Sequence, residues 1–390
     1  MKKLGILTLV FFNYGTRLQS YALCKAIEKI KPSSLPFEVI NIEGIWSEKV
    51  VNKKKLLINC VSYYKTKSIK KIFYLIKWRI EDWLIKKKDH SEEEAKRIKK
   101  FSSLIRKIPY SRKKYTCTDI RNGVLNKYSA ILVGSDQVWN GIKVPCQDIY
   151  MLDYFNGKGL SYAASFGLKT IPQKQFNNYQ HRINRFDKLL VREENGVELC
   201  KTLGRNDAEC VLDPTLLLSK EEYQTLISHD ELIHENFILV YSLNYSYQIY
   251  NQADKFAKKN NCRMVILKRS FCPPKASVYP NAIQLYEVSP EDFLWLIHNA
   301  KCIITNSYHA MLFSIIFNKN FYLYLDKCDE ENSRMLSLSK ICHLNNRIVW
   351  EFDTLPLTNY DIDYAPVNSI IEYHRQKSMN LLQQAINSIM

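Results

Sequence analysis

The chain of 390 residues lacks any uninterrupted apolar stretch close to the roughly 18 residues that a membrane-spanning helix needs. Its first residues, MKKLGILTLVFFNYG, have the lysines and the apolar core of a signal peptide, but no small-residue cleavage site follows them. We therefore expect a buried strand here. The chain is long for one core, so two domains are favoured.

The sequence also lacks any Cys-x-x-Cys pair, although it contains eleven cysteines. An odd number of cysteines, several of them inside apolar runs, argues against a disulfide framework and against a zinc site. No dinucleotide-binding glycine fingerprint, Walker sequence, internal repeat or low-complexity tract is present. We therefore expect a reduced, cytoplasmic protein with no metal and no organic cofactor.

Acidic residues are scarce in one part of the chain. The net charge is +17, and residues 51–114 alone contain 21 Lys and Arg against 6 Asp and Glu, a net +15. Within this basic segment, apolar residues from Ile69 to Trp83 recur at helical spacing among the cations. Such a helix can lie on an anionic membrane surface, but an ordinary solvated helix face has the same pattern. Because no nucleic-acid-binding module accompanies the charge, we do not expect nucleic acid as a partner.

Apolar strands alternate with helical patterns along most of the chain, which is typical of parallel βαβ units. A polar helical stretch at 219–236 separates two series of strands. We therefore predict an α/β fold with two Rossmann-like domains, 1–218 and 232–365, with the basic segment as a helical insertion in the first. A C-terminal helix at 366–390 is expected to pack back on the first domain. The strands of the first series are predicted at 4–10, 130–134, 159–167, 188–196 and 209–218.

The candidate site residues follow from this architecture, because ligands of open parallel sheets bind beyond the carboxyl ends of the strands. Polar and glycine residues at the corners between strand and helix are therefore the candidates. In the chain they are Asn13, Tyr14, Gly15, Arg17, Gly134, Ser135, Asp136, Trp139, Arg192, Asn306, Ser307 and His309.

His309 follows the apolar strand CIIT, in the first turn of a helix predicted to start near Ser307. The start of a helix favours a bound anion and disfavours a protonated imidazole. The ring shares a helical face with Leu312, Phe313 and Ile316, so a buried structural histidine is the alternative.

Arg192 follows the apolar strand KLLV and precedes two glutamates. It is either a partner in a local ion pair or a guanidinium that recognises phosphate or carboxylate. Ser135 and Asp136 either cap a helix or belong to a sugar site. In that site Trp139 would offer an apolar platform to the sugar ring; its alternative place is the core.

Six segments in this order resemble the polysaccharide pyruvyl transferases: NYGTRLQSYAL, YSAILVGSDQVWN, LSYAASFG, LLVREENG, CVLDPTLLL and ITNSYHAMLFSIIFNKNF. The resemblance extends over most of the chain outside 45–115. It implies two domains like those of the GT-B glycosyltransferases. It also implies transfer of the enolpyruvyl carbons of phosphoenolpyruvate to two sugar hydroxyls as a cyclic ketal, commonly on a polyprenyl-diphosphate-linked saccharide at the inner face of the plasma membrane.

In this resemblance His309 is the acid that protonates C3 of the donor, and Asp136 is a base for the attacking hydroxyl. Some family members have Arg-Leu-His where this chain has Ser307, Tyr308 and His309. Another cation must replace that arginine, and we expect it to be Arg334, in ENSRMLSLSK.

Donor and acceptor contacts are divided between the remaining corners. We expect the Arg192→Ala exchange to weaken donor binding and to leave the fold intact. The donor is expected to contact Arg192, Arg334, Asn306 and Ser307. The acceptor is expected to contact Asn13, Tyr14, Gly15, Arg17, Ser135 and Trp139.

Two other functions fit the sequence. One is a GT-B glycosyltransferase that uses a nucleotide sugar, and the other is a non-catalytic carbohydrate-binding or scaffold protein of a membrane assembly. Stabilisation by phosphoenolpyruvate, by nucleotide sugars or by neither distinguishes the three.

Overall fold

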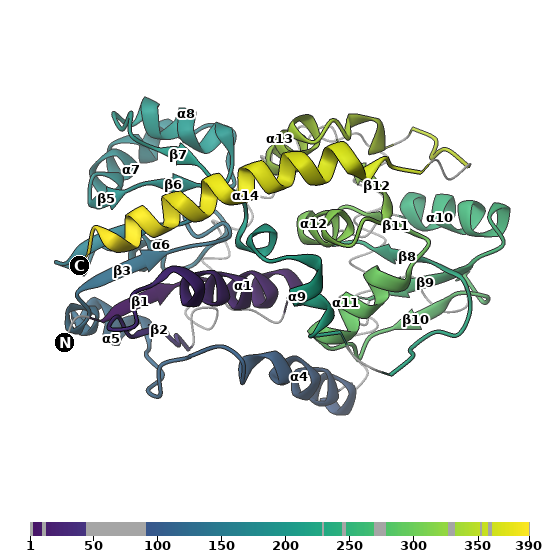
Figure 1. The fold of residues 1–390 in the computed structure, drawn as a ribbon, viewed down its shortest axis with the longest axis horizontal. Coiled ribbons are helices and arrows are strands. Elements are labelled where there is room, and N and C mark those ends of the chain that lie inside the picture. Colours follow the sequence, from purple (N-terminus) through teal and green to yellow (C-terminus); the bar gives the residue numbers. More distant parts are fainter. Residues whose placement is uncertain are drawn as a thin grey trace.

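The computed structural model describes residues 3–9, 13–43, 91–227, 230–243, 247–268, 278–326, 332–351, 353–357 and 361–389. Figure 1 shows two halves, each built of helices packed on a sheet, with one long helix running across both. The predicted amphipathic helix from Ile69 to Trp83 lies outside the described residues, as does most of the basic segment.

The first half is built on a parallel sheet of five strands in the order β2-β1-β3-β4-β5. A short parallel pair, β6-β7, lies beside it. The strands are β1 (Leu4–Leu7), β2 (Phe37–Val39), β3 (Ala130–Val133), β4 (Lys158–Ser161), β5 (Phe186–Lys188), β6 (Leu190–Val191) and β7 (Glu209–Cys210). The helices are α1 (Tyr14–Ile30), α4 (Ser91–Ile105), α5 (Cys117–Arg121), α6 (Gln147–Tyr150), α7 (Phe176–Ile183) and α8 (Glu194–Thr202).

The second half is built on a parallel sheet of six strands in the order β10-β9-β8-β11-β12-β13. Its strands are β8 (Phe237–Tyr241), β9 (Arg263–Leu267), β10 (Ile283–Leu285), β11 (Cys302–Thr305), β12 (Asn320–Leu325) and β13 (Ile348–Trp350). Its helices are α10 (Tyr247–Lys259), α11 (Pro290–Asn299), α12 (Tyr308–Ile316) and α13 (Ser333–Ile341).

The central strands form from continuous apolar runs because both faces of each sheet are covered. Every residue of β1, β3, β8 and β11 is buried. Strands of this kind are typical of parallel sheets covered by helices on both sides. The predicted α/β fold with two Rossmann-like domains is therefore confirmed.

The last helix, α14 (Tyr364–Asn387), crosses from the second half to the first (Figure 1). Arg375 Nε donates to the carbonyl oxygen of Leu216 at 2.7 Å, and the Ser378 hydroxyl accepts from the backbone N–H of Leu212 at 3.0 Å. Leu382 of the same helix is fully buried. The helix thus packs on the segment that follows β7, close to the corner that holds Asp213.

The two halves also meet at the start of α1. The ring of Tyr14 is stacked on Phe101 of α4 at 4.8 Å and on Phe293 of α11 at 4.7 Å between ring centroids. Its hydroxyl donates to the carbonyl oxygen of Val288 at 3.3 Å. Tyr14 is 1% exposed, so its predicted contact with an acceptor sugar is wrong for this structure. Its ring instead fixes the start of α1 against the second half.

Some local predictions were wrong, and two short strands were missed. The apolar residues after Asp213 form a 3₁₀ helix, η3 (Pro214–Leu217), rather than a strand, because Asp213 accepts from the backbone N–H of Thr215 and Pro214 favours a helical start. In the polar stretch at 219–236, the described residues (219–227 and 230–236) form only the short helix α9 (Lys220–Gln224). The strands β2 and β13 were missed because three-residue strands leave little alternation in the sequence.

Candidate functional site

A cluster of charged side chains lies where corners of the two halves meet. Asp136 follows β3, Arg192 follows β6 and Asp213 follows β7. His309 and Arg334 come from the second half, in the first turns of α12 and α13. Four of these five were predicted from the sequence, and the structure brings them together.

Arg192 is the centre of this cluster. Its Nη1 lies 3.2 Å from Asp213 Oδ2 and 3.5 Å from Asp136 Oδ1, and its Nε lies 3.6 Å from Glu193 Oε2. Burial favours the neutral form, but Asp136, Tyr308 and Asp213 outweigh it and raise the pKa of Arg192. The local ion pair that the sequence suggested is therefore present, together with contacts to two distant corners.

The burial of Arg192 corrects one expectation. Its side chain has no exposed surface and pairs with three carboxylates. Removal of one partner from a buried ion pair typically costs about 3–5 kcal/mol because the other charge stays buried. The Arg192→Ala exchange therefore endangers the fold and cannot serve as a clean test of ligand binding.

Asp136 is held by a tight turn after β3. A Cβ atom at Gly134, whose φ is +129°, would lie 2.1 Å from the carbonyl oxygen of Tyr162, so only glycine fits there. Burial raises the pKa of Asp136, but Arg192, His309 and Arg334 lower it further than burial raises it. The net lowering keeps this carboxylate ionised at neutral pH.

Neither Ser135 nor Asp136 caps a helix, contrary to one of the two interpretations of this corner. The Ser135 hydroxyl donates to Asp213 Oδ2 at 3.4 Å, and Asp136 Oδ1 accepts from the backbone N–H of Gln137 at 2.9 Å. Both side chains therefore belong to the charged cluster.

His309 lies against both halves of the molecule. Its Nε2 is buried 3.7 Å from Asp213 Oδ2, beyond hydrogen-bond distance, and has no hydrogen-bond partner among the described residues. On the other side of the ring, a Cβ atom at Gly15 would lie 2.1 Å from His309 Nδ1. Gly15 therefore admits the ring by lacking a side chain. Gly15 thus lies at the site through its contact with His309, and its contact with the acceptor stays a prediction.

The ionisation of His309 follows from its surroundings. Burial lowers its pKa most strongly, the carboxylates Asp213 and Asp136 oppose this, and Arg192 and Arg334 lower it again. The net pKa lies below the ordinary value of histidine. The imidazole is therefore neutral at neutral pH when no ligand is bound, as the position at a helix start predicted.

Arg334 lies where a second cation was expected. Its Cζ is 5.1 Å from the centroid of the Tyr308 ring, and Arg192 Cζ is 5.0 Å from the same centroid. Its Nη1 is 3.9 Å from Asp136 Oδ1, and its side chain is 12% exposed. Burial and the nearby Arg192 lower the pKa of Arg334. An anion beside it would remove part of that repulsion.

Several side-chain nitrogen atoms of the cluster are buried and lack hydrogen-bond partners among the described residues. They belong to Arg192 (Nε and Nη2), Arg334 (Nε) and His309 (Nε2). A buried donor without a partner costs about 1–3 kcal/mol, so a ligand that satisfies it recovers that free energy. The carboxylates of Asp136, Glu193 and Asp213 already pair with Arg192. A polyanion therefore has to compete with them for the guanidiniums, or its binding has to be accompanied by uptake of a proton. The arrangement can therefore bind an oxyanion and respond to it by protonation of His309.

The other predicted residues have local structural partners. Asn13 accepts from the backbone N–H of Gly15 and caps α1, and Ser307 accepts from the backbone N–H of Ala310 and caps α12. Asn306 Oδ1 accepts from the backbone N–H of Leu243 at 2.7 Å. These side chains shape the corners of the site.

Arg17 and Trp139 lie outside the charged cluster. Arg17 Nη1 donates to the hydroxyl of Tyr110 at 3.1 Å. Trp139 is fully buried, and its Nε1 donates to the carbonyl oxygen of Tyr150 at 3.1 Å. The prediction of Trp139 as a sugar platform is therefore wrong for this structure, and its alternative place in the core is correct.

The roles of Asp213 and Tyr308 in the cluster were not predicted from the sequence. Asp213 stands at a corner of the same type as the predicted ones, within the segment CVLDPTLLL, so the signal was present. Tyr308 directly precedes His309, but the sequence analysis gave its ring no role of its own.

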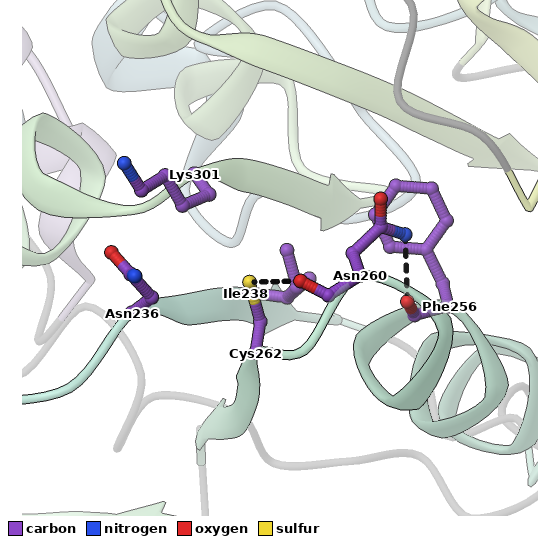
Figure 2. A pocket seen from close by; sticks show the side chains of 6 residues that line it. All are labelled: Asn236, Ile238, Phe256, Asn260, Cys262 and Lys301. Atoms are coloured by element: carbon purple, nitrogen blue, oxygen red, sulfur yellow. Dashed lines mark hydrogen bonds between the residues drawn. The ribbon is translucent and has the colours of Figure 1, made fainter.

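A small cavity lies at the opposite edge of the second sheet. Figure 2 shows the side chains of Asn236, Ile238, Phe256, Asn260, Cys262 and Lys301 around it. These residues gather at the amino ends of β8, β9 and β11 and at the end of α10. The cavity is therefore separate from the charged cluster at the other ends of the strands.

Within the described ranges, no group of three or more His, Cys, Asp or Glu side chains has an arrangement that could hold a metal ion. Over the same part of the chain, no helix combines the length and the apolarity that crossing a membrane requires.

The chain matches one protein family over most of its length. The family model for polysaccharide pyruvyl transferase matches residues 13–325. These residues include every member of the charged cluster except Arg334. A sequence comparison with curated proteins finds no match.

Solved structures share the fold. UDP-N-acetylglucosamine 2-epimerase from Rickettsia bellii has a TM-score of 0.51 at 10% identity, over 100% of this chain and 96% of that chain. A putative UDP-N-acetylglucosamine 2-epimerase from Listeria monocytogenes has a TM-score of 0.51 at 11% identity, over 98% of this chain and 91% of that chain. These similarities show that the architecture is of the GT-B type, as predicted.

The contact between Gly15 and His309 gives a prediction. The Gly15→Ala exchange places a methyl group on the His309 ring and forces the ring to move. Overpacking of this kind typically costs about 1–3 kcal/mol. In the background of His309→Ala the same exchange should cost little, because the ring is gone. Chemical or thermal unfolding of the four proteins of this cycle measures the coupling.

Additive effects of the two exchanges would contradict the placement of the ring against α1. The double-mutant cycle measures the free energy of unfolding, so its result does not depend on the identity of the ligand.

Proposed function

The chain belongs to the polysaccharide pyruvyl transferase family, and we propose that its donor is phosphoenolpyruvate and its acceptor a lipid-linked saccharide. The observation that carries the donor proposal is the convergence of Arg192, Arg334 and His309, which present buried nitrogen atoms without hydrogen-bond partners among the described residues. Phosphoenolpyruvate has a carboxylate and a phosphate on adjacent positions. Its recognition therefore requires fixed cations and oriented donors at one place.

The proposed reaction forms a ketal and releases phosphate. Protonation of the C3 methylene makes C2 of the donor electrophilic, and a sugar hydroxyl then forms a bond to C2 and gives up its proton. The C2–O bond to phosphate breaks with its electron pair on the departing phosphate. A second hydroxyl closes the ring, and its proton leaves with the phosphate. The net reaction converts one donor and two hydroxyls into a cyclic ketal and inorganic phosphate.

Two side chains of the cluster suit the proton transfers. His309 is neutral without ligand, and a bound phosphate beside it would raise its pKa and supply the proton for C3. Asp136 stays ionised because Arg192, His309 and Arg334 lower its pKa more than burial raises it, so it can accept a hydroxyl proton. The steps as written draw on side chains alone and on no metal or organic cofactor.

A lipid-linked acceptor would place the protein at a membrane surface on the cytoplasmic side. The described end of the basic segment offers an exposed cationic surface for this. Phe101 and Leu104 turn the apolar face of α4 inward, so the cations of its other face stay in water. We name four exposed cations the α4 cations: Lys99 and Lys100 of α4, and Arg106 and Lys107, which directly follow its last residue.

The reaction itself is the first test of the proposal. Mass spectrometry of lipid-linked saccharides incubated with phosphoenolpyruvate should reveal a pyruvate ketal adduct, with one phosphate released for each adduct.

His309→Gln should keep donor binding but lower turnover by about 10²–10⁴-fold, the usual contribution of general acid catalysis. The melting temperature of the variant serves as the control for folding. Near-normal turnover by this variant would show that His309 is not the general acid and has only a structural role.

Arg334 offers a cleaner test of donor binding than Arg192, because its one ion pair with a described residue is long, at 3.9 Å. Loss of one charge-assisted hydrogen bond costs about 1.5–3 kcal/mol. Arg334→Gln should therefore weaken phosphoenolpyruvate binding roughly tenfold to a hundredfold, and Arg334→Lys should restore part of it. Calorimetry measures the affinity, and Lys340→Gln at the exposed end of α13 is the matched control.

Unchanged affinity in Arg334→Gln would exclude Arg334 from the donor site. Stabilisation of the wild type by nucleotide sugars and not by phosphoenolpyruvate would favour a GT-B glycosyltransferase instead.

The membrane proposal is tested with vesicles that contain anionic lipid. Binding should fall as salt rises, and replacement of the four α4 cations by Gln should reduce it by about 1 kcal/mol per charge. Turnover with a short water-soluble acceptor should survive. The control replaces four exposed lysines elsewhere: Lys169, Lys174, Lys255 and Lys259. Equal losses in the two variants would mean that net charge alone, and no particular surface, governs binding.

A further inference from the structure

Asp213 is a buried carboxylate that joins the two halves of the charged cluster. It ends the short segment after β7 and caps η3, where its Oδ1 accepts from the backbone N–H of Thr215 at 3.0 Å and from the Thr215 hydroxyl at 2.8 Å. Its side chain has no exposed surface. These contacts fix the orientation of the carboxylate and leave Oδ2 for other partners.

The second oxygen faces three different corners. Oδ2 accepts from Arg192 Nη1 at 3.2 Å and from the Ser135 hydroxyl at 3.4 Å. His309 Nε2 lies 3.7 Å from the same oxygen. Arg192 and Ser135 follow strands of the first half, whereas His309 belongs to α12 of the second half. One oxygen atom is thus placed between the cation of the donor site and the proposed acid.

We propose that Asp213 is a positioning residue for pyruvate transfer: its Oδ2 holds the Arg192 guanidinium and stabilises the protonated ring of His309 that delivers the proton to C3. This inference rests on the proposed function for its catalytic meaning. Its electrostatic part does not need the ligand: the Asp213 carboxylate favours the imidazolium form of His309 in the free protein as well.

The other charges around His309 determine which variant gives a clear result. Asp136 also favours the imidazolium, whereas Arg192 and Arg334 oppose it. Tyr308 is adjacent, and burial together with Asp213 raises its pKa, so it stays neutral. Removal of the Asp213 charge therefore leaves the guanidiniums of Arg192 and Arg334 opposed only by the carboxylate of Asp136. The neutral form of the His309 ring becomes more stable relative to the imidazolium.

The exchange Asp213→Asn removes the charge and keeps the size of the side chain. The asparagine oxygen can still accept from Thr215, as Oδ1 does now. An opposite charge within about 4–6 Å shifts a pKa by roughly 1–3 units. The pKa of His309, measured by NMR of ring-labelled protein without ligand, should fall by about that amount. The alkaline limb of the kcat profile, where the acid loses its proton, should move to lower pH in the same direction.

The exchange Ser135→Ala should shift the pKa of His309 in the opposite direction, through the same oxygen, Oδ2 of Asp213. The exchange removes a hydrogen bond that Oδ2 now accepts and so leaves more of its negative charge for His309. The pKa of His309 and the alkaline limb should move to higher pH. The exchange is small, so it keeps the inference testable if Asp213→Asn does not fold.

If Asp213 had only a structural role, the two exchanges would lower stability or turnover. They would not shift the His309 pKa and the alkaline limb of kcat in opposite directions. An unchanged His309 pKa in the folded Asp213→Asn protein, or a downward shift in Ser135→Ala, would overturn the inference. Absence of ketal formation by the wild type would count against the proposed function instead. The ligand-free NMR measurement keeps the two failures distinct.

Discussion

A guanidinium withdrawn completely from water is the constraint on which the site depends. The Arg192 side chain has no exposed surface, and the cost of burying its charge is offset by three carboxylates from different places in the chain. Asp136, Glu193 and Asp213 must therefore converge whenever the first half folds. The contacts at 3.2–3.6 Å leave Nη2 without a hydrogen-bond partner in the described part of the protein, and so leave capacity for a ligand.

The second half completes the site because the two halves are joined next to it. Tyr14, stacked between α4 and α11, fixes the start of α1, and Gly15 in the next position lets His309 approach. Oδ2 of Asp213 then lies 3.7 Å from His309 Nε2 across the boundary between the halves. The aromatic contact and the charged cluster are thus parts of one arrangement, in which a packing residue sets the position of a reactive one.

The sequence predicted the corners better than the direction of the side chains in them. Parallel strands end at a common edge, so residues that follow strands gather there whatever their spacing along the chain. For this reason His309, Asp136 and Arg192 were found from pattern and family resemblance together. Trp139 and Tyr14 occupy corners too, but their rings point into the core, which depends on neighbours from distant segments.

Other features depended on contacts that local sequence does not encode. Arg334 reaches the cluster only because α13 packs beside α12, and its selection came from the absence of the family arginine at Ser307. Asp213 was missed although it stands at a corner, because its importance comes from a partner in the other half of the molecule. The short helix η3 was taken for a strand because an apolar run alone does not separate the two.

The central claim is that these corners form a donor site in which a bound anion raises the pKa of His309, so that the ring takes up a proton. Its most direct test is an NMR titration of the His309 ring with and without saturating phosphoenolpyruvate. We predict a pKa below the ordinary histidine value in the free protein, where burial favours the neutral ring, and a clear rise when the donor is bound. An unchanged pKa at saturation, or no binding of the donor at all, would contradict the account.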